Sequence, residues 1–211
     1  GTDHLQIRGV RQRQAPPMTA QMKLGVFGGA FNPIHLGHLM LAETARESLS
    51  LDRIVFIPTY KPPHKSSKEL LPGAQRLEMI RLAIREQPAF VASEIELEQQ
   101  KASYSINPIK ALPAQLPQAK LFLLVGEDML AVRWFAWEEI KRLCTVMVAH
   151  RPNAKTSRRE AGVKWLKMPQ MEIASSDIRA RLRAGRSIRH LVPPAVERYL
   201  EQHQLYRPRV S

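Results

Sequence analysis

Short apolar runs alternate along this chain with longer stretches in which apolar positions recur every three or four residues. Short runs bounded by glycine, proline or polar residues are typical of buried strands, and the longer periodic stretches are typical of helices that pack on a sheet. The pattern predicts strands at 23–27, 53–58, 90–97, 120–125 and 144–149, and another near 164–168. It predicts helices at 36–50, 74–87, 104–115, 137–143, 176–184 and 193–203.

The alternation of strands with helices indicates an α/β fold in which a parallel sheet is covered on both faces. We expect a Rossmann-like, doubly wound parallel sheet in a single domain at 22–211, with a small C-terminal helical part at about 170–206. Residues 1–21 show no periodic apolar pattern, and we expect them to form a disordered tail outside the fold.

Ligands of such sheets bind beyond the carboxyl ends of the strands, where the strand order reverses. The segments that directly follow predicted strands are therefore the candidate site loops. These segments are 28–35, 58–66, 126–136 and 150–157.

The first of these loops is the richest in candidate chemistry. Gly28-Gly29 ends the first predicted strand, and His35 and His38 follow at the start of the next helix. The free amides and the dipole of a helix N-terminus favour an anion. Histidines three residues apart lie close together on a helix, and each can donate a hydrogen bond to a phosphate. The segment therefore predicts a site for a nucleotide triphosphate.

The two histidines have other interpretations, which the segment alone leaves open. They are also typical of residues that cap or stiffen a helix start, or of partly exposed surface groups. A zinc pair on a helix usually has four-residue spacing and needs further ligands. The chain has one cysteine, Cys144, and no third ligand is evident nearby, which disfavours a metal site.

A second candidate anion site lies at 173–179, where the sequence predicts a helix start. Ser175 or Ser176 is expected as the N-cap, and Asp177 suits the N-terminal dipole. Three arginines then follow at helical spacing and are expected on one face. They are Arg179, Arg183 and Arg186. Taken alone, this pattern is also that of an ordinary capped helix with a solvated basic face.

Composition adds a strong basic excess to this picture. The formal net charge is +13, and residues 151–211 contain 14 lysines and arginines against 5 acidic residues. Such an excess fits nucleic-acid binding, attraction of nucleotides or a soluble surface. The sequence has no apolar run of membrane-spanning length, and its single cysteine suits a reducing compartment. We expect a cytoplasmic protein without membrane contacts, in which Cys144 is a buried thiol.

Two motifs carry a family resemblance. Residues 28–38, Gly-Gly-Ala-Phe-Asn-Pro-Ile-His-Leu-Gly-His, resemble the GGTFDPxHxGH signature of the nucleotidyltransferase superfamily, and Ser175-Ser176-Asp177-Ile178-Arg179 is similar to its second, SSTxIR-type motif. Three further segments resemble those of bacterial nicotinate-nucleotide adenylyltransferases, in consistent order from about Lys23 to Tyr206. They are Lys61-Pro62-Pro63-His64-Lys65, Ser103-Tyr104-Ser105, and Gly126-Glu127-Asp128 followed by Trp134-Phe135-Ala136-Trp137-Glu138.

The chain departs from the family pattern at four places. Asn32 stands where the family usually has aspartate, and Ala30 stands where it usually has threonine. Asn107-Pro108 replaces a typical Asp-Thr pair, and the stretch between Asp128 and Trp134 is about two residues shorter than the family pattern.

The resemblance implies transfer of the adenylyl group of ATP to nicotinate mononucleotide, giving nicotinate adenine dinucleotide and pyrophosphate without a covalent enzyme intermediate. It implies that His35, His38 and Arg179 are catalytic, with His38 on the α-phosphate. The implied ATP-binding residues are Gly28, Gly29, Ala30, Phe31, His35, His38, Gly126, Ser175, Ser176 and Arg179. The implied acceptor-binding residues are His64, Lys65, Ser105, Asp128 and Trp134.

The implied cofactor is Mg²⁺, which accompanies ATP and bridges phosphate oxygens, with no side chain assigned as its ligand. Trp134 is expected to stack on the pyridine ring, whereas Trp137 and Trp165 are expected mainly in the core. Two alternatives remain: a related transferase with another acceptor, such as nicotinamide mononucleotide or phosphopantetheine, or, in a different class, a basic nucleic-acid-binding protein. The paired phosphate motifs favour ATP and a mononucleotide as partners over nucleic acid.

Overall fold

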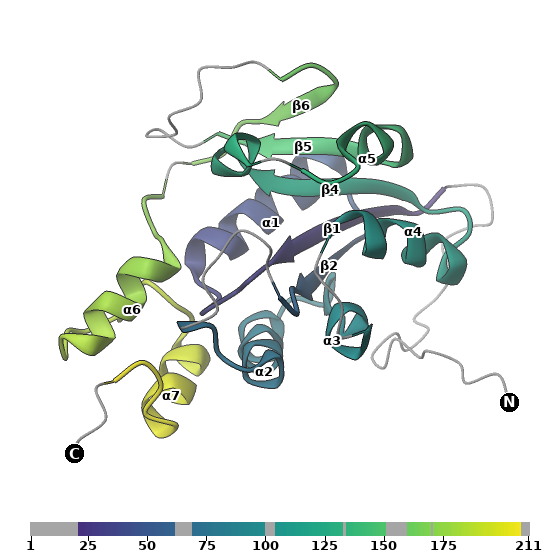
Figure 1. Cartoon of the computed structure of the whole chain (residues 1–211). Helices are drawn as coiled ribbons and strands as arrows, with labels where there is room; N and C mark the ends of the chain where they lie inside the picture. The colour runs from purple at the N-terminus through teal and green to yellow at the C-terminus, as the bar shows by residue number, and fades with distance from the viewer. Residues whose placement is uncertain are drawn as a thin grey trace, which may run out of the picture.

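Six parallel strands form one sheet in the computed structural model, which describes residues 21–61, 69–99, 104–132, 134–150, 160–169 and 171–207. The strand order is β3-β2-β1-β4-β5-β6, and every neighbouring pair is parallel. The chain runs outward from β1 to β3 and then returns to the centre at β4, so the order reverses between β1 and β4 (Figure 1). The strands are β1 Lys23–Gly29, β2 Arg53–Pro58, β3 Phe90–Ala92, β4 Lys120–Gly126, β5 Thr145–Ala149 and β6 Val163–Leu166. The expected Rossmann-like fold is confirmed.

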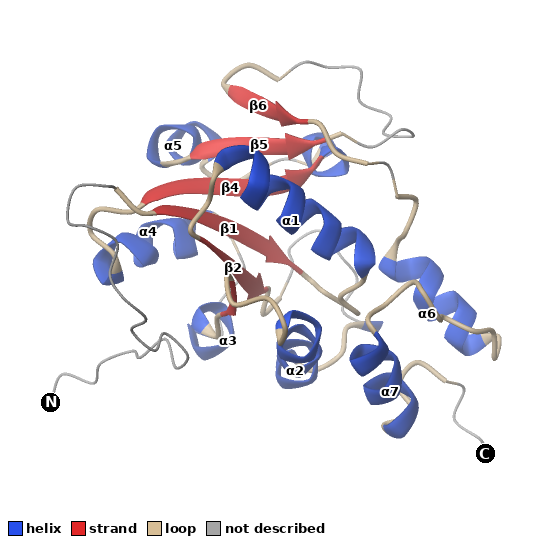
Figure 2. Ribbon diagram, turned by 180° about the vertical axis from the view of Figure 1, so that it is seen from behind, coloured by secondary structure: helices blue, strands red, loops and turns tan. Residues whose placement is uncertain are grey.

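Helices cover both faces of the sheet. The α-helices are α1 Leu36–Leu49, α2 Gly73–Ile84, α3 Ile95–Gln99, α4 Ile106–Gln115, α5 Trp137–Leu143, α6 Ser175–Arg183 and α7 Pro194–Gln202. One core contains residues of α1, α2, α6 and α7, among them Leu41 and Ile178, packed on side chains such as Phe27. The other contains residues of α3, α4 and α5 packed on side chains such as Val26. Adjacent strand residues point to opposite faces, which is why Val26 and Phe27 belong to different cores. Figure 2 shows α1 lying across the face of the sheet that is turned away in Figure 1.

The predicted strand at 90–97 is wrong in its second half. Strand β3 ends at Ala92, and the short helix α3 begins at Ile95. The Oγ of Ser93 accepts a hydrogen bond from the amide of Ile95, and this local contact turns the chain away from the sheet edge. The apolar alternation was misleading because Ile95, although buried, is the first residue of a helix and not part of a strand. The other predicted strands and helices occur, with bounds within three residues of those expected. A 3₁₀-helix that was not predicted, η2 Glu127–Ala131, follows β4.

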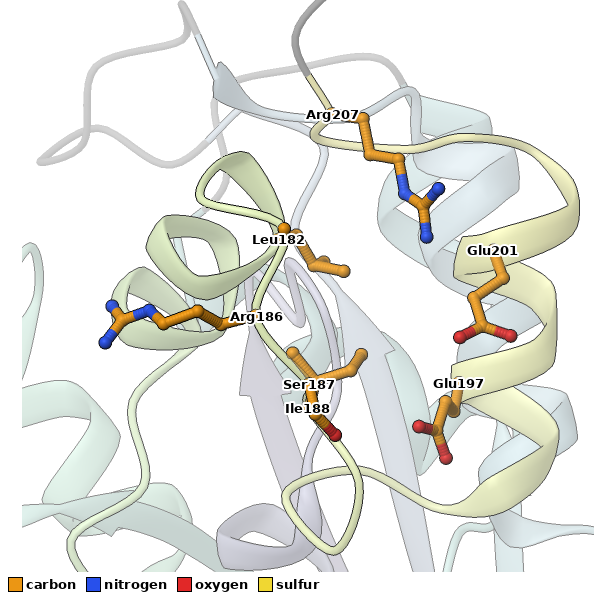
Figure 3. Close-up of a pocket in the computed structure, with 8 residues that line it drawn as sticks. Leu182, Arg186, Ser187, Ile188, Glu197, Glu201 and Arg207 are labelled. Carbon is orange, nitrogen blue, oxygen red and sulfur yellow. The ribbon is translucent and has the colours of Figure 1, made fainter.

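The C-terminal helices lie beyond the ends to which the strand arrows point (Figure 1). Helix α6 ends at Arg183, and Gly185 has a left-handed backbone with a φ of 63°. This turn places Arg186 outside the helix, so the expected single face of three arginines is wrong. Arg186 instead lines a pocket of about 260 Å³ between the end of α6 and helix α7 (Figure 3). No helix in the described part of the chain has the length and apolar character needed to cross a membrane.

Candidate active site

The carboxyl end of β1 is open on the side that faces β4, where the strand order reverses. The β1–β2 ladder continues to Gly29, whereas the β1–β4 ladder stops at Val26, so β1 and β4 part at their carboxyl ends. A Cβ atom at Gly28 would meet no atom within 4 Å. A Cβ atom at Gly29 would stand 3.1 Å from the Phe31 ring, so a side chain there would crowd this ring. Open space therefore lies beside the backbone of Gly28, at the position where ligands bind in sheets of this kind.

His35 and His38 lie together at the start of α1. His35 is the N-cap residue and is 2% exposed, and its ring stacks on that of His38 with 3.7 Å between centroids. The backbone amide of His35 donates to Nδ1 of His38 at 3.2 Å. Because Nδ1 accepts, the neutral ring of His38 carries its proton on Nε2, and that atom is the one that can donate to a ligand. His38 thus has the capping role that the sequence left open, and this role fixes the tautomer a phosphate donor needs.

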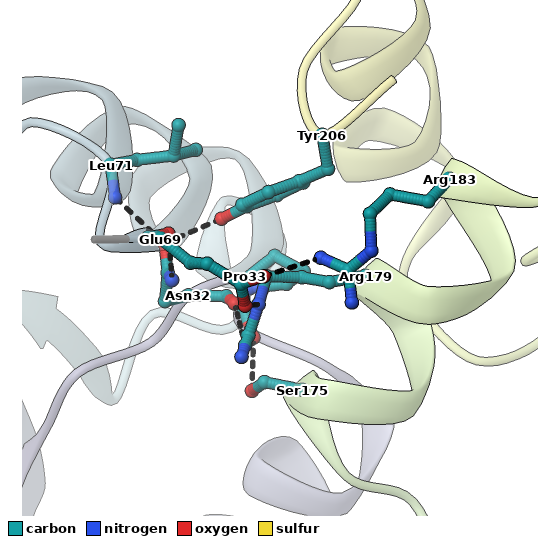
Figure 4. A network of polar contacts seen from close by, with 8 residues as sticks. All are labelled: Asn32, Pro33, Glu69, Leu71, Ser175, Arg179, Arg183 and Tyr206. Carbon is teal, nitrogen blue, oxygen red and sulfur yellow. Dashed lines mark hydrogen bonds and ion pairs between the residues drawn. The ribbon is translucent and has the colours of Figure 1, made fainter. Parts of the chain in front are cut away.

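The two motif segments, far apart in sequence, meet in the structure. The hydroxyl of Ser175 donates to the carbonyl of Pro33 at 2.9 Å, a contact between residues 142 positions apart. Nη1 of Arg179 donates to the carbonyl of Asn32 at 2.9 Å. The start of α6 is therefore fastened to the loop between β1 and α1 (Figure 4). The expected serine cap is wrong, because Ala174 is the N-cap residue and the Ser175 hydroxyl is directed to this loop instead.

Glu69 joins two arginines of α6. Its carboxylate lies 3.2 Å from Nε of Arg179 and 2.9 Å from Nη1 of Arg183. The Arg179 side chain is 17% exposed and the Glu69 side chain is 51% exposed, so the pair lies at the edge of the site and not inside the core. A cation held this way stays beside the site and faces solvent, where an anionic ligand can reach it.

Two further residues of this region, Asn32 and Tyr206, were not expected in the site. The side chain of Asn32 is hydrogen-bonded to Glu69, Leu71 and Tyr206, which come from two separate parts of the chain. Burial raises the pKa of Tyr206, while the nearby guanidinium groups of Arg179 and Arg76 act in the opposite direction. The Tyr206 phenol therefore remains a hydrogen-bond donor at neutral pH. The sequence marks Asn32 only as a departure from the family motif, and no local pattern singles out Tyr206.

Arg76 is a third residue that the sequence analysis missed. It is 1% exposed and donates to the carbonyls of Leu71, Ala30 and Thr59 at 2.7 to 2.9 Å. Burial lowers the pKa of its guanidinium. One side chain therefore joins the loop after β1, the loop after β2 and the start of α2. The sequence does carry a signal for it, because Arg76 stands four residues before Ile80, on the apolar face of its helix.

A carboxylate and an imidazole meet at the ends of β4 and β5. Glu127 follows Gly126, the last residue of β4, and its side chain is 4% exposed. One carboxylate oxygen of Glu127 lies 2.7 Å from Nδ1 of His150, the residue after β5. This contact joins the ends of β4 and β5 beside Gly126, whereas Asp128 is exposed on the following turn.

Segments that carry three of the expected acceptor-binding residues, Ser105, Asp128 and Trp134, lie close together. The ring of Tyr104 lies 4.8 Å from that of Phe135, which places the segment of Ser105 beside the segment of Trp134. The indole nitrogen of Trp134 donates to the carbonyl of Met129 at 2.7 Å, and its ring lies 4.9 Å from that of Trp137.

The two other tryptophans differ from one another. Trp137 is partly buried against the core, as expected, and its indole nitrogen donates to Glu160 at 3.1 Å. Trp165 is 39% exposed, so its expected core position is wrong. The reason is that β6 is an edge strand, with a neighbouring strand on one side only.

His64 and Lys65 lie outside the described residues, as does Ser103. Within the described ranges there is no group of three or more histidine, cysteine or acidic residues placed to hold a metal ion. The donors around the β1–α1 loop are imidazole, guanidinium, hydroxyl and amide groups, and these suit phosphate better than a cation.

A parallel sheet with this strand order and a phosphate-type donor set at the reversal point defines a nucleotide-binding α/β protein. Comparison with known proteins narrows the class. The model of the cytidylyltransferase-like family matches residues 26–181.

Two relatives illustrate the degree of similarity. The chain is 39% identical over 188 residues to a probable nicotinate-nucleotide adenylyltransferase of Thermus thermophilus, covering 88% of this chain and 100% of the relative. It is also 39% identical over 193 residues to a probable nicotinate-nucleotide adenylyltransferase of Salinibacter ruber, covering 89% of this chain and 99% of the relative.

Solved structures agree with the fold. The Plasmodium falciparum nicotinic acid mononucleotide adenylyltransferase complexed with NaAD has a TM-score of 0.72 at 17% identity, covering 88% of this chain and 97% of that chain. A putative nicotinate-nucleotide adenylyltransferase from Vibrio parahaemolyticus has a TM-score of 0.67 at 22% identity, covering 88% and 95%. The chain belongs to the cytidylyltransferase-like family and, within it, to the nicotinate-nucleotide adenylyltransferases.

Proposed function

We propose that this protein transfers the adenylyl group of ATP to nicotinate mononucleotide, forming nicotinate adenine dinucleotide and pyrophosphate, as a step of NAD biosynthesis. The observation that carries the proposal is the junction of the β1–α1 loop with the start of α6 through Ser175 and Arg179. This junction gathers His35, His38 and Arg179 around one site at the strand reversal. The names of the similar proteins supply the chemical identity of the acceptor.

The reaction is an in-line displacement at phosphorus. A phosphate oxygen of the mononucleotide attacks the α-phosphorus of ATP, the bond from that phosphorus to the bridging oxygen breaks, and pyrophosphate leaves with the electron pair. No enzyme nucleophile is needed, so the protein contributes alignment and stabilisation of charge. The donor set of the candidate site is of the type that this task requires.

His38 is assigned to the α-phosphate. This assignment is supported by the bond from the His35 amide to Nδ1, which places the proton of the neutral ring on Nε2 and restrains rotation of the ring. His35 packs against it and is assigned to the same phosphate region, together with the backbone of Gly28, Gly29, Ala30 and Phe31. Gly126, at the end of β4, is assigned to the adenosine side of the site.

Arg179 and the amides of Ser175 and Ser176 are assigned to the β- and γ-phosphates. The first amides of a helix have no partner within the helix and point outward from its N-terminus. Arg179 already has the carboxylate of Glu69 as an anionic neighbour, so a triphosphate exchanges one anion for another without exposing an uncompensated cation.

Mg²⁺ is assigned to ATP and not to a protein cage. The described residues provide no acidic cluster for a metal ion, whereas Mg²⁺ retains water and binds phosphate oxygens readily. The ion would supply charge neutralisation on the phosphates. Chelation with EDTA should then abolish pyrophosphate release, and excess Mg²⁺ should restore it.

The acceptor is assigned to the side of the site formed by the segments of Ser105, Asp128 and Trp134. The Tyr104–Phe135 contact brings the first and last of these segments together. His64 and Lys65 are assigned to the phosphate of the mononucleotide. Trp134 is assigned to the pyridine ring, with its ring held by the bond to the Met129 carbonyl.

The test is pyrophosphate release with ATP and Mg²⁺ across a panel of acceptors that contains nicotinate mononucleotide, nicotinamide mononucleotide, nicotinate and phosphopantetheine. We expect the highest kcat/KM with nicotinate mononucleotide. A higher value with any other acceptor would overturn the assignment of the substrate. Release that requires no acceptor would overturn the transfer reaction itself.

A further inference from the structure

Asn32 contacts the part of the site that the motif resemblance does not describe. Asn32 is 6% exposed and lies in the loop between β1 and α1. Oδ1 accepts from the hydroxyl of Tyr206 at 2.5 Å and from the amide of Leu71 at 3.1 Å. Nδ2 donates to the carbonyl of Glu69 at 2.9 Å. Figure 4 shows these partners converging on Asn32 from the segment before α2 and from the C-terminal segment.

This arrangement requires an amide. Two partners are donors and one is an acceptor, and a single asparagine side chain satisfies all three with its carbonyl and its NH₂ group. A carboxylate has the same shape but no donor, so it would face the Glu69 carbonyl oxygen with an unprotonated oxygen of its own. Asn32, which stands where the family usually has aspartate, is therefore matched to these particular partners.

The segment held by Asn32 is Glu69–Leu71. In the sequence it stands between helix α2 and the residues assigned to the acceptor phosphate, His64 and Lys65, which lie outside the described residues. Glu69–Leu71 is fixed at several points. Asn32 binds the carbonyl of Glu69 and the amide of Leu71, while Arg76 binds the carbonyl of Leu71. The carboxylate of Glu69 contacts Arg179 at the same time.

The backbone of Asn32 serves the other substrate. Its carbonyl accepts from Nη1 of Arg179, which is assigned to the ATP phosphates. The side chain of Asn32 therefore contacts the segment next to the residues assigned to the acceptor. Its backbone carbonyl contacts Arg179, which is assigned to ATP. A substitution of the side chain changes the first set of contacts and leaves the backbone bond in place.

We propose that Asn32 is a positioning residue whose amide side chain sets the position of Glu69–Leu71 relative to Arg179, with Tyr206 holding the amide from the opposite side. Glu69–Leu71 follows in sequence the residues assigned to the acceptor phosphate. This inference rests on the proposed adenylyl transfer to a mononucleotide. It assigns to Asn32 and Tyr206 a role in acceptor binding without direct contact to the reacting atoms.

The main test compares Asn32→Asp and Asn32→Leu in the full chain. Asn32→Asp removes one donor, and Asn32→Leu removes all three side-chain bonds. We expect KM for nicotinate mononucleotide to rise about tenfold in the first variant and further in the second, which is the scale of one or more lost buried hydrogen bonds. KM for ATP should stay within about twofold. Gln118→Glu, an exposed amide at the amino-terminal edge of the sheet, is the matched charge control and should leave both values unchanged.

The Tyr206→Phe variant tests the opposite side of the contact. It removes the hydroxyl that reaches Oδ1 and keeps the aromatic ring, so KM for the mononucleotide should rise by a smaller factor, about threefold. Tyr199→Phe removes a hydroxyl from α7 and serves as its control. Equal increases of both KM values, a fall in kcat alone, or no change in the Asn32 variants would each overturn the proposal.

Hydrogen exchange gives a readout that does not depend on activity. The Leu71 amide loses its acceptor in Asn32→Leu, so peptides that contain Glu69–Leu71 should exchange faster in this variant than in the wild type, while peptides from β4 should not change. Unchanged exchange at Glu69–Leu71 would contradict the anchoring role. If the wild type fails to use nicotinate mononucleotide, the proposed function falls, and the exchange experiment still decides whether Asn32 holds this segment.

Discussion

At the scale of single residues, the site depends on side chains that have two tasks. His38 accepts from the amide at the start of its own helix, and this contact leaves Nε2 as the ring atom that carries the proton of the neutral imidazole. Ser175 begins a helix and also binds the neighbouring loop. In both cases a structural and a functional interpretation of the same residue are compatible, because the structural bond orients the functional atom.

The first prediction concerns His38. Replacement by alanine should lower kcat roughly 10²-fold or more, because a donor to the transition state is lost. Circular dichroism should show an intact fold, since the ring is only partly buried. His203→Ala changes an exposed histidine at the end of α7 and is the control, with kcat unchanged. Turnover close to the wild type in His38→Ala would remove this residue from the mechanism.

At the scale of elements, helices α2 and α6 approach the β1–α1 loop from different directions. Helix α6 contributes Arg179 and Arg183, and both contact Glu69. Helix α2 contributes Arg76, which lies underneath the loops after β1 and β2. The two helices therefore have different roles: α6 presents charge to the site, and α2 holds the backbone that forms it.

The second prediction separates the two arginines of α6. Arg179→Ala should raise KM for ATP at least tenfold, the effect expected for loss of a charge-assisted phosphate contact. The effect on KM for the mononucleotide should be smaller. Arg183→Ala removes the other arginine that contacts Glu69. The side chain of Arg183 is more exposed than that of Arg179, so this variant should change KM for ATP less than threefold. Steady-state kinetics with each substrate varied in turn provide the measurement. An unchanged KM for ATP and an unchanged rate in Arg179→Ala would exclude the second phosphate contact.

The third prediction concerns the buried guanidinium of α2. Arg76→Met leaves three carbonyls without their donor, which should lower the free energy of unfolding by about 2 to 4 kcal/mol, even though the desolvation cost of the guanidinium disappears. Arg81→Met on the exposed face of the same helix removes a surface ion pair with Glu94 and should cost less than about 1 kcal/mol. Urea unfolding of both variants gives the comparison. Equal stability of Arg76→Met and the wild type would show that the three carbonyls find other donors.

At the scale of the whole molecule, two apolar cores enclose the sheet, and the polar groups that matter gather at its carboxyl edge. The single cysteine lies in the core formed with α3, α4 and α5, where its Sγ hydrogen-bonds to the Ile140 carbonyl. Its burial, as expected from the sequence, links the stability of the whole fold to pH.

The fourth prediction concerns this linkage. Burial raises the pKa of Cys144 from 9.0 to about 11. The folded state therefore holds the thiol proton more tightly than the unfolded state, and the resulting stability is present below pH 9 and is lost as the pH rises toward 11. The free energy of unfolding of the wild type, compared with Cys144→Ala, should fall by about 2 to 3 kcal/mol over this interval. Chemical denaturation at several pH values measures the difference. A difference independent of pH would contradict the linkage.

The fold was largely predictable because it follows from local pattern. Alternation of apolar runs and periodic segments requires a parallel sheet with helices on both faces. Two failures occurred where a local turn interrupted the apolar pattern. A serine-assisted turn at Ser93 ended the strand at 90–97 early, and the left-handed Gly185 removed Arg186 from its predicted face.

The sequence by itself determined the α/β fold class, the two segments with candidate phosphate chemistry and the family resemblance, because each of these resides in residues close together along the chain. Only the tertiary structure decided which polar groups meet. The bond between Ser175 and Pro33 and the bond between Tyr206 and Asn32 join residues more than 140 positions apart. The contacts of Arg76 with three carbonyls before α2 and after β1 and β2 depend in the same way on how the helix packs. Local preferences carry no information about such distant partners, because the partners are chosen by packing and by the need of every buried polar group for a hydrogen bond.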